Sequence, residues 1–334
     1  MLYNHVIPPM SRRPALSLVV ASFATGAAAE VPRVAVDVAP VHSLVAMVMA
    51  DVGTPDLVMP PGSSPHDHSL RPSEAAALQD ADLLFWIGPG LTPWMEDAVE
   101  TLADGAIVVS LLDAQGVERL PIRENALFEH ADHGHGGEDE HDAEDDHGEE
   151  DGHDDHGHGA DDPHAWLSPA NAAVWLDVVA DRLAEADPAN ADAYRANAAA
   201  GRDGIGALRD GIEATLAPVR DGRFVVFHDA YQYFEAAFDI PAAGALSVSD
   251  AAEPGPARLD SIQARIRAEG IDCVLAEPQF NPGLVDAVRD GTEVAVGTLD
   301  PLGSGLEPGP DLYPRLMRDL ADALAGCLSG KDGA

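Results

Sequence analysis

Short apolar runs alternate with stretches of helical periodicity along most of the chain. Apolar residues in short continuous or alternating runs predict strands, and apolar residues three or four positions apart predict helices. In the first half of the chain this pattern predicts strands at residues 34–38, 57–59, 83–87 and 107–109 and helices at 42–49, 73–81 and 93–102. Strands that alternate with helices across short loops are typical of a largely parallel sheet covered by helices.

After a break, the same alternation resumes in the second half of the chain. Strands are expected at residues 224–227, 243–248, 273–276 and 294–296, and helices at 231–237, 258–269, 284–289 and 312–328. The second half repeats the first in architecture, although no repeat is detectable in the residues themselves. We therefore predict an α/β fold with two lobes, each with a mostly parallel sheet flanked by helices, and a ligand-binding cleft between them.

Two helical stretches lie between the lobes. Apolar residues keep helical spacing over residues 169–186, and a second stretch covers 189–216. Asp187 and Pro188 separate the two stretches, since such a pair ends a helix. We assign residues 169–187 to a long linking helix that joins and spans the lobes. The predicted domain boundaries are 30–168 for the N-terminal lobe and 188–334 for the C-terminal lobe.

Composition limits the possible partners. The chain has 334 residues, 46% of them hydrophobic, so it is long enough to bury two cores. It carries 58 acidic residues against 19 basic residues, with a net charge of −39. Because nucleic-acid binding requires basic patches, this balance argues against a nucleic acid as the partner. Cations are the natural partners, although most of the excess acid serves a solvated surface.

The break between the two halves is a tract of unusual composition, residues 129–162. It contains eight histidines and sixteen acidic residues but no Lys or Arg. Such a composition cannot bury enough apolar surface to fold, so we expect a disordered loop. We expect several weak zinc sites in this tract, which either supply zinc to a tighter site elsewhere in the chain or sense the zinc level. The alternative is a solvated insertion whose metal binding is incidental. The auxiliary candidates are His130, His133, His135, His141, His147, His153, His156 and His158.

The first residues follow the order of a secretory signal. Arg12 and Arg13 precede an apolar run at residues 15–23, and a run of three alanines ends at Ala29. The apolar run is too short to span a bilayer. We therefore predict a signal peptide over residues 1–29, cleaved near Ala29, and a periplasmic location. An uncleaved anchor is the alternative.

Export bears on the only two cysteines of the chain, Cys273 and Cys327. In an oxidising compartment, two cysteines can form a disulfide, which is our prediction for this pair. Two unpaired, buried thiols are the alternative.

Outside residues 1–29 and the tract, five histidines remain, and three of them occupy comparable places. His66 follows the second predicted strand through a proline-rich loop, His228 follows the first strand of the second lobe, and His164 stands just before the linking helix. Ligands in open α/β sheets gather at the carboxyl ends of strands, so these side chains can converge. Three imidazoles suit Zn²⁺, with a fourth position left open or filled by a carboxylate such as Asp300.

Neighbouring residues have less specific interpretations. His42 is interpreted as a helix-start residue, and His68 either points away from the site or has a transient role. Three acidic residues could orient the ligand imidazoles or cap helices instead: Asp67, Asp229 and Glu277.

Five motifs resemble those of the zinc-binding proteins of bacterial ABC importers, and they occur in the same order. They are PHDHSLRPS (65–73), DPHAWLSP (162–169), FHDAYQYF (227–234), AEPQF (276–280) and LDPLG (299–303). The resemblance runs from about Val34 to the C-terminus. It implies that His66, His164 and His228 are the metal ligands and that Asp300 is the acidic residue of the site.

The resemblance also bears on metal choice. In the zinc-specific branch a His-rich insertion precedes the second ligand, and paired cysteines resemble Cys273 and Cys327. Manganese-selective relatives place a carboxylate where this chain has His228, and nitrogen-rich sites suit zinc better than manganese, although copper and nickel would also bind. Some members have an acidic residue before the first ligand, where this chain has Pro65, so the fourth ligand is open between Asp300 and water.

The implied function is a high-affinity receptor that captures Zn²⁺ in the cleft and delivers it to the membrane permease of an ABC importer. We expect a monomer without enzymatic activity. A zinc hydrolase is an alternative, because three histidines and an open position also hold catalytic zinc, but the chain has no His-Glu-x-x-His motif and no obvious general base. An extracytoplasmic zinc buffer or adhesin is the other alternative.

Overall fold

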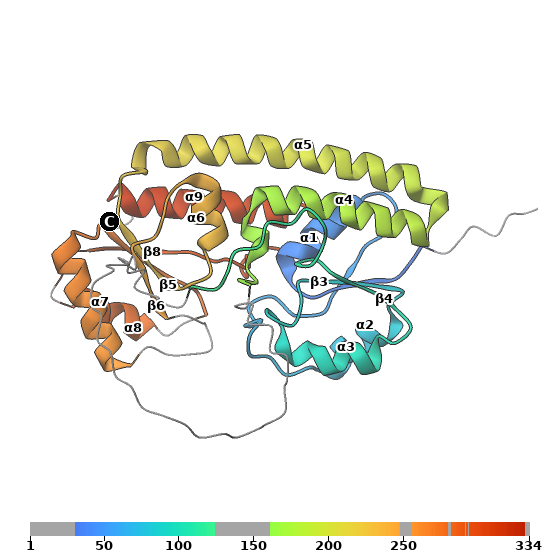
Figure 1. The fold of residues 1–334 in the computed structure, drawn as a ribbon, viewed down its shortest axis with the longest axis horizontal. Coiled ribbons are helices and arrows are strands. Elements are labelled where there is room, and N and C mark those ends of the chain that lie inside the picture. Colours follow the sequence, from blue (N-terminus) through green and yellow to red (C-terminus); the bar gives the residue numbers. More distant parts are fainter. Residues whose placement is uncertain are drawn as a thin grey trace, which may run out of the picture.

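The computed structural model describes residues 31–123, 161–247, 255–279, 282–290, 292 and 294–330. Within these ranges the chain forms two four-stranded sheets, with the orders β2-β1-β3-β4 and β6-β5-β7-β8, and every strand pair in them is parallel. Helices flank each sheet (Figure 1). The predicted two-lobed α/β fold is confirmed.

The strands and helices follow one another in strict alternation within each lobe. The first lobe contains β1 (Val34–Val36), α1 (Ala39–Val48), β2 (Asp56–Leu57), α2 (Pro72–Asp80), β3 (Leu83–Trp86), η1 (Pro93–Met95), α3 (Glu96–Leu102) and β4 (Ile107–Ser110). The second contains β5 (Phe224–His228), α6 (Gln232–Phe238), β6 (Gly244–Ser247), α7 (Pro256–Glu269), β7 (Cys273–Ala276), α8 (Pro282–Arg289), β8 (Ala295–Thr298) and α9 (Leu312–Leu328). Strands β1, β3 and β5 are buried along their whole length, because helices cover both faces of a parallel sheet.

The long helix that runs along both lobes is α5 (Ala191–Leu216), not the predicted segment 169–187 (Figure 1). It packs on α1 and α4 of the first lobe and on α9 of the second. The predicted segment contains α4 (Pro169–Ala186), which packs against α1 and α5. Both helices carry an apolar stripe, so periodicity alone does not distinguish the spanning helix; their tertiary contacts do.

The two lobes share one apolar core beneath α5. A single cluster of buried side chains joins β1 and α1 to α4, α5 and α9. Hydrogen bonds cross the same junction: Ser43 Oγ donates to the Pro310 carbonyl (3.1 Å) and accepts from the Tyr313 amide (2.9 Å). The Tyr313 hydroxyl donates to the Trp166 carbonyl (2.9 Å). Because a large apolar interface resists separation, this side of the molecule holds the lobes in one orientation.

A disulfide joins Cys273 on β7 to Cys327 on α9, which confirms that prediction. The predicted signal peptide and the eight histidines of the tract lie outside the described residues. Among the helices of the described ranges, we find none with the length and apolar character needed to cross a bilayer.

Candidate metal centre

His66 lies in the loop between β2 and α2, at the carboxyl end of the first sheet. The loop is fixed on both sides of the histidine. The Pro65 carbonyl accepts a hydrogen bond from the indole Nε1 of Trp94 (2.8 Å), and the His66 amide donates to Ser64 Oγ (3.2 Å). These bonds hold the half-buried His66 imidazole at the junction of the lobes.

His164 is buried immediately before η2 (Ala165–Leu167), the short 3-10 helix that leads into α4. Its ring Nδ1 contacts Asp162 Oδ1 at 2.7 Å, and its backbone amide donates to the same oxygen at 2.9 Å. Two residues later, the indole Nε1 of Trp166 donates to the Pro301 carbonyl in the second lobe (2.8 Å). Since a carboxylate only accepts, Nδ1 of His164 is the donor, and in a neutral imidazole the lone pair is then on Nε2.

His228 is the last residue of β5 and is also buried. Its Nδ1 lies 2.5 Å from Oε1 of Glu277, which follows the neighbouring strand β7. The other oxygen, Oε2, accepts from the side-chain amide of Gln279 (2.8 Å). The carboxyl ends of two paired parallel strands thus bring the imidazole and its carboxylate together, and Nε2 of His228 is again the lone-pair nitrogen.

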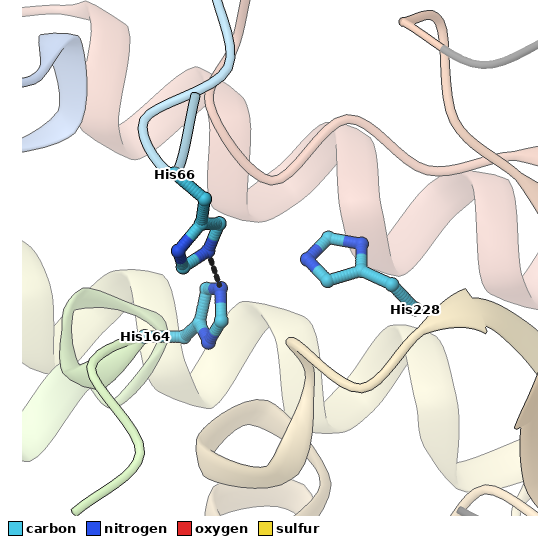
Figure 2. Close-up of side chains that lie close together, drawn as sticks. All are labelled: His66, His164 and His228. Carbon is cyan, nitrogen blue, oxygen red and sulfur yellow. Dashed lines mark hydrogen bonds between the residues drawn. The ribbon is translucent and has the colours of Figure 1, made fainter. Parts of the chain in front are cut away.

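The three imidazoles converge (Figure 2). One ligand nitrogen from each lies within 4.8 Å of the others, and His66 Nε2 is 3.3 Å from His164 Nε2. Nitrogens bound tetrahedrally to one Zn²⁺ at 2.0–2.1 Å would be about 3.4 Å apart, so this pair already has suitable spacing. The space that the three histidines line is small, about 10 Å³. The arrangement can hold one divalent cation.

Asp300, the predicted fourth ligand, is not a member of this group of residues. Its Oδ1 accepts from the amides of Leu302 (3.1 Å) and Gly303 (2.9 Å), and its Oδ2 accepts from the amide (2.7 Å) and hydroxyl (2.6 Å) of Ser304. A carboxylate offers about four acceptor sites, so all of them are engaged within the loop. In this geometry Asp300 is held by its own loop, and the fourth ligand stays open between Asp300 and water.

The other histidines of the described ranges lie outside the group. His68 Nε2 contacts Glu74 Oε2 at 3.0 Å and its ring meets the edge of Trp94, so it points away from the centre. His42 is buried in α1 with Nε2 3.1 Å from the Pro55 carbonyl, and burial lowers the pKa of its imidazole. Neither adds a nitrogen to the site.

The acidic neighbours divide into two kinds. Glu277 contacts the imidazole of His228, a candidate ligand, whereas Asp67 is exposed. Asp229 pairs instead with the guanidinium of Arg123, and burial raises the pKa of its carboxyl against the opposing effect of that charge. Sequence reasoning missed Asp162, because it is one of sixteen acidic residues in the tract; its Asp-x-His spacing was the available signal.

Replacing Glu277 with glutamine should lower zinc affinity by about 10- to 100-fold, since loss of the carboxylate reduces ligand basicity and loosens the imidazole. The affinity is measured by titration against a competing chelator. Glu74→Gln is the matched control, because it makes the same change beside His68, a histidine outside the group. Equal losses in the two variants would contradict a positioning role for Glu277.

Comparison with known proteins finds related sequences and a related structure for this chain. Residues 34–327 match the family described as zinc-uptake complex component A, periplasmic (ZnuA). The high-affinity zinc uptake system protein ZnuA of Brucella suis biovar 1 (strain 1330) is 45% identical over 311 residues, covering 90% of this chain and 93% of the relative. Its namesake from Paracoccus denitrificans (strain Pd 1222) is 44% identical over 324 residues, covering 95% and 98%. A crystal structure of ZnuA has the same fold, with a TM-score of 0.71 at 21% identity over 90% of this chain and 100% of that chain.

Proposed function

Because the chain belongs to the ZnuA family of periplasmic zinc-uptake components, we propose that it is the receptor of an ABC importer that captures Zn²⁺ between its lobes and delivers it to the membrane permease. The observation that carries this proposal is the convergence of His66, His164 and His228. Two of these come from the first lobe and its connection to α4, and the third comes from the second lobe. A cation bound there would contact both lobes at once.

Charge balance supports a divalent cation as the cargo. The three imidazoles bind as neutral ligands, and the carboxylates of Asp162 and Glu277 accept hydrogen bonds from Nδ1 of His164 and His228. Two negative charges one ring away from the ion offset the two positive charges of Zn²⁺ in a buried place. Nitrogen ligands favour Zn²⁺ over Mn²⁺. Water or Asp300 completes the coordination, and Asp300 would take that place only by releasing its loop.

The proposed role is non-enzymatic. This role is that of the family of zinc-uptake components to which the chain belongs. The protein works outside the cytoplasm as a monomer, exported by the predicted signal at residues 1–29. The tract histidines are auxiliary, and a permease and an ATPase encoded beside this chain would be the expected partners.

Deleting residues 129–159 should lower the number of zinc ions bound while one tight site remains. The deletion is compatible with the fold, because Pro121 and Asp161, which flank the deleted segment, form an isolated antiparallel bridge and so already lie side by side. Calorimetric zinc titration with a competing chelator, on the full mature chain and on the deletion, makes the comparison. Loss of all tight binding in the deletion would make the protein a His-rich zinc buffer and would overturn the receptor proposal.

A further inference from the structure

Arg123 bridges the two lobes beside the metal centre. It follows the last strand of the first lobe, and its guanidinium binds two carboxylates of the second lobe, Asp229 and Glu235. Nε donates to Asp229 Oδ2 (3.1 Å), Nη1 donates to Glu235 Oε2 (3.0 Å), and Nη2 donates to Glu235 Oε1 (3.0 Å) and to Asp229 Oδ1. The planar fork thus spans both acids.

The bridge is more enclosed than an ordinary surface ion pair. The side chains of Asp229 and Glu235 are only 6% and 5% exposed, and that of Arg123 is 23% exposed. Glu235 also accepts from the Ala242 amide (3.1 Å), which ties it to the second lobe. Exposed pairs contribute little, but a shielded pair that fits a bidentate fork holds a defined geometry.

Asp229 is bonded in sequence to His228, so the bridge acts directly on the loop that carries a ligand. On its other side, the segment before Arg123 is tied to the second ligand: the Asp162 amide donates to the Leu120 carbonyl (2.7 Å), and Asp162 holds the His164 ring. Arg123 is therefore connected to a ligand of each lobe by short paths.

Tyr233 reinforces the same junction from α6. Its hydroxyl accepts from the Leu120 amide (3.0 Å) and donates to the Asp162 carbonyl (3.0 Å). The side chain of Gln232 donates to the Pro121 carbonyl (3.2 Å). Side chains of the second lobe thus hydrogen-bond to the segment just before Arg123 and to Asp162.

A pocket of about 180 Å³ adjoins the metal centre at this point. Its lining includes two of the candidate ligands, His66 and His164, together with Arg123 and Asp229 of the bridge. A cation leaving His66 and His164 toward this pocket would pass the guanidinium and its carboxylates.

We propose that Arg123 is a positioning residue that locks the lobes across this pocket and thereby slows the release of zinc. The inference rests on the proposed zinc-receptor function. The direction of the change in release rate distinguishes this lock from a simple effect of the Arg123 charge. Removing a positive charge near Zn²⁺ would, by electrostatics alone, tighten binding and slow release. Removing the lock would free the His228–Asp229 loop and speed release.

The test measures zinc release from the mature protein by stopped-flow mixing with excess chromogenic chelator. Arg123→Met keeps a stem of similar length and should release zinc about 10-fold faster, the scale of other outer contacts to metal ligands. Arg123→Lys keeps the charge but cannot span both acids, and should release zinc about 3-fold faster. Arg119→Met is the matched control: Arg119 is 50% exposed and pairs with Asp113 and Asp161 nearby, and its loss should change release by less than about 2-fold.

Unchanged or slower zinc release in Arg123→Met would overturn the lock. Release at the wild-type rate in Arg123→Lys would also overturn it. The lysine variant therefore tests the proposal even if the methionine variant does not fold. A purely structural role would lower the unfolding midpoint of the metal-free protein without changing release, and that result also overturns it. A wild-type protein without a tight site would overturn the proposed function and the lock together, whereas a normal wild type with unaltered variants would overturn the lock alone.

Discussion

Replacing His228 with alanine is expected to weaken zinc binding by about 10³-fold, or about 4 kcal/mol. Four-ligand zinc sites bind with about 10–16 kcal/mol, so one ligand carries roughly a quarter of that free energy. His228 is the one member of the three-histidine group from the second lobe, since the other two stand on the first lobe and its exit. The variant would also leave the buried Glu277 without its imidazole partner. A large loss is therefore expected from this position.

Competition titration against a chelator of known affinity measures the change. His68→Ala is the matched control, because His68 lies two residues from His66 and bonds to Glu74 instead of facing the centre. It should keep the wild-type affinity within about 2-fold, as expected for a residue outside the ligand set. Equal losses in the two variants, or a tight site that survives in His228→Ala, would contradict the three-histidine site.

The order of strands and helices could be predicted because each element shows the apolar periodicity of its own type in its own residues. Helices 169–186 and 312–328 and strand 273–276 have the predicted bounds. Helix α4 begins with a proline at its first position and with Ser168, whose side chain accepts from the Asn171 amide, so sequence and structure agree on its start. The approach of His66 and His228 was also predictable, since both follow strands of parallel sheets, whereas His164 stands before η2 and not at the end of a strand.

The features that could not be predicted depend on contacts between distant segments. Which of two consecutive amphipathic helices spans the lobes is decided by packing on α9, which no local pattern encodes. Asp300 accepts a hydrogen bond from the nearby Ser304 amide, but a metal ion would also attract its carboxylate. The residue types alone do not indicate which of these two interactions is stronger. The role of Arg123 could not be predicted from the sequence, because its partners Asp229 and Glu235 lie more than a hundred residues further along the chain.

Reduction of the disulfide between Cys273 and Cys327 is expected to lower the free energy of unfolding of the metal-free protein by about 4 kcal/mol. The bond closes a loop with a sequence separation of 54, and its constraint on the unfolded chain is lost when the bond opens. Both side chains are buried, so reduced wild-type protein keeps the packing atoms and isolates the effect of the bond. Urea unfolding of oxidised and reduced protein measures the difference, and equal midpoints would contradict it.

Zinc affinity should respond far less to the same reduction. Cys273 begins β7, whereas Glu277 follows the other end of the strand, about 13 Å away in extended chain. The shared core beneath α5 also remains intact, because it depends on apolar packing across the lobes. Folded, reduced protein should therefore bind zinc within about 3-fold of the oxidised form, since sites this far apart usually act independently. A parallel loss of stability and affinity would mean instead that the bond at the base of β7 holds Glu277 against His228.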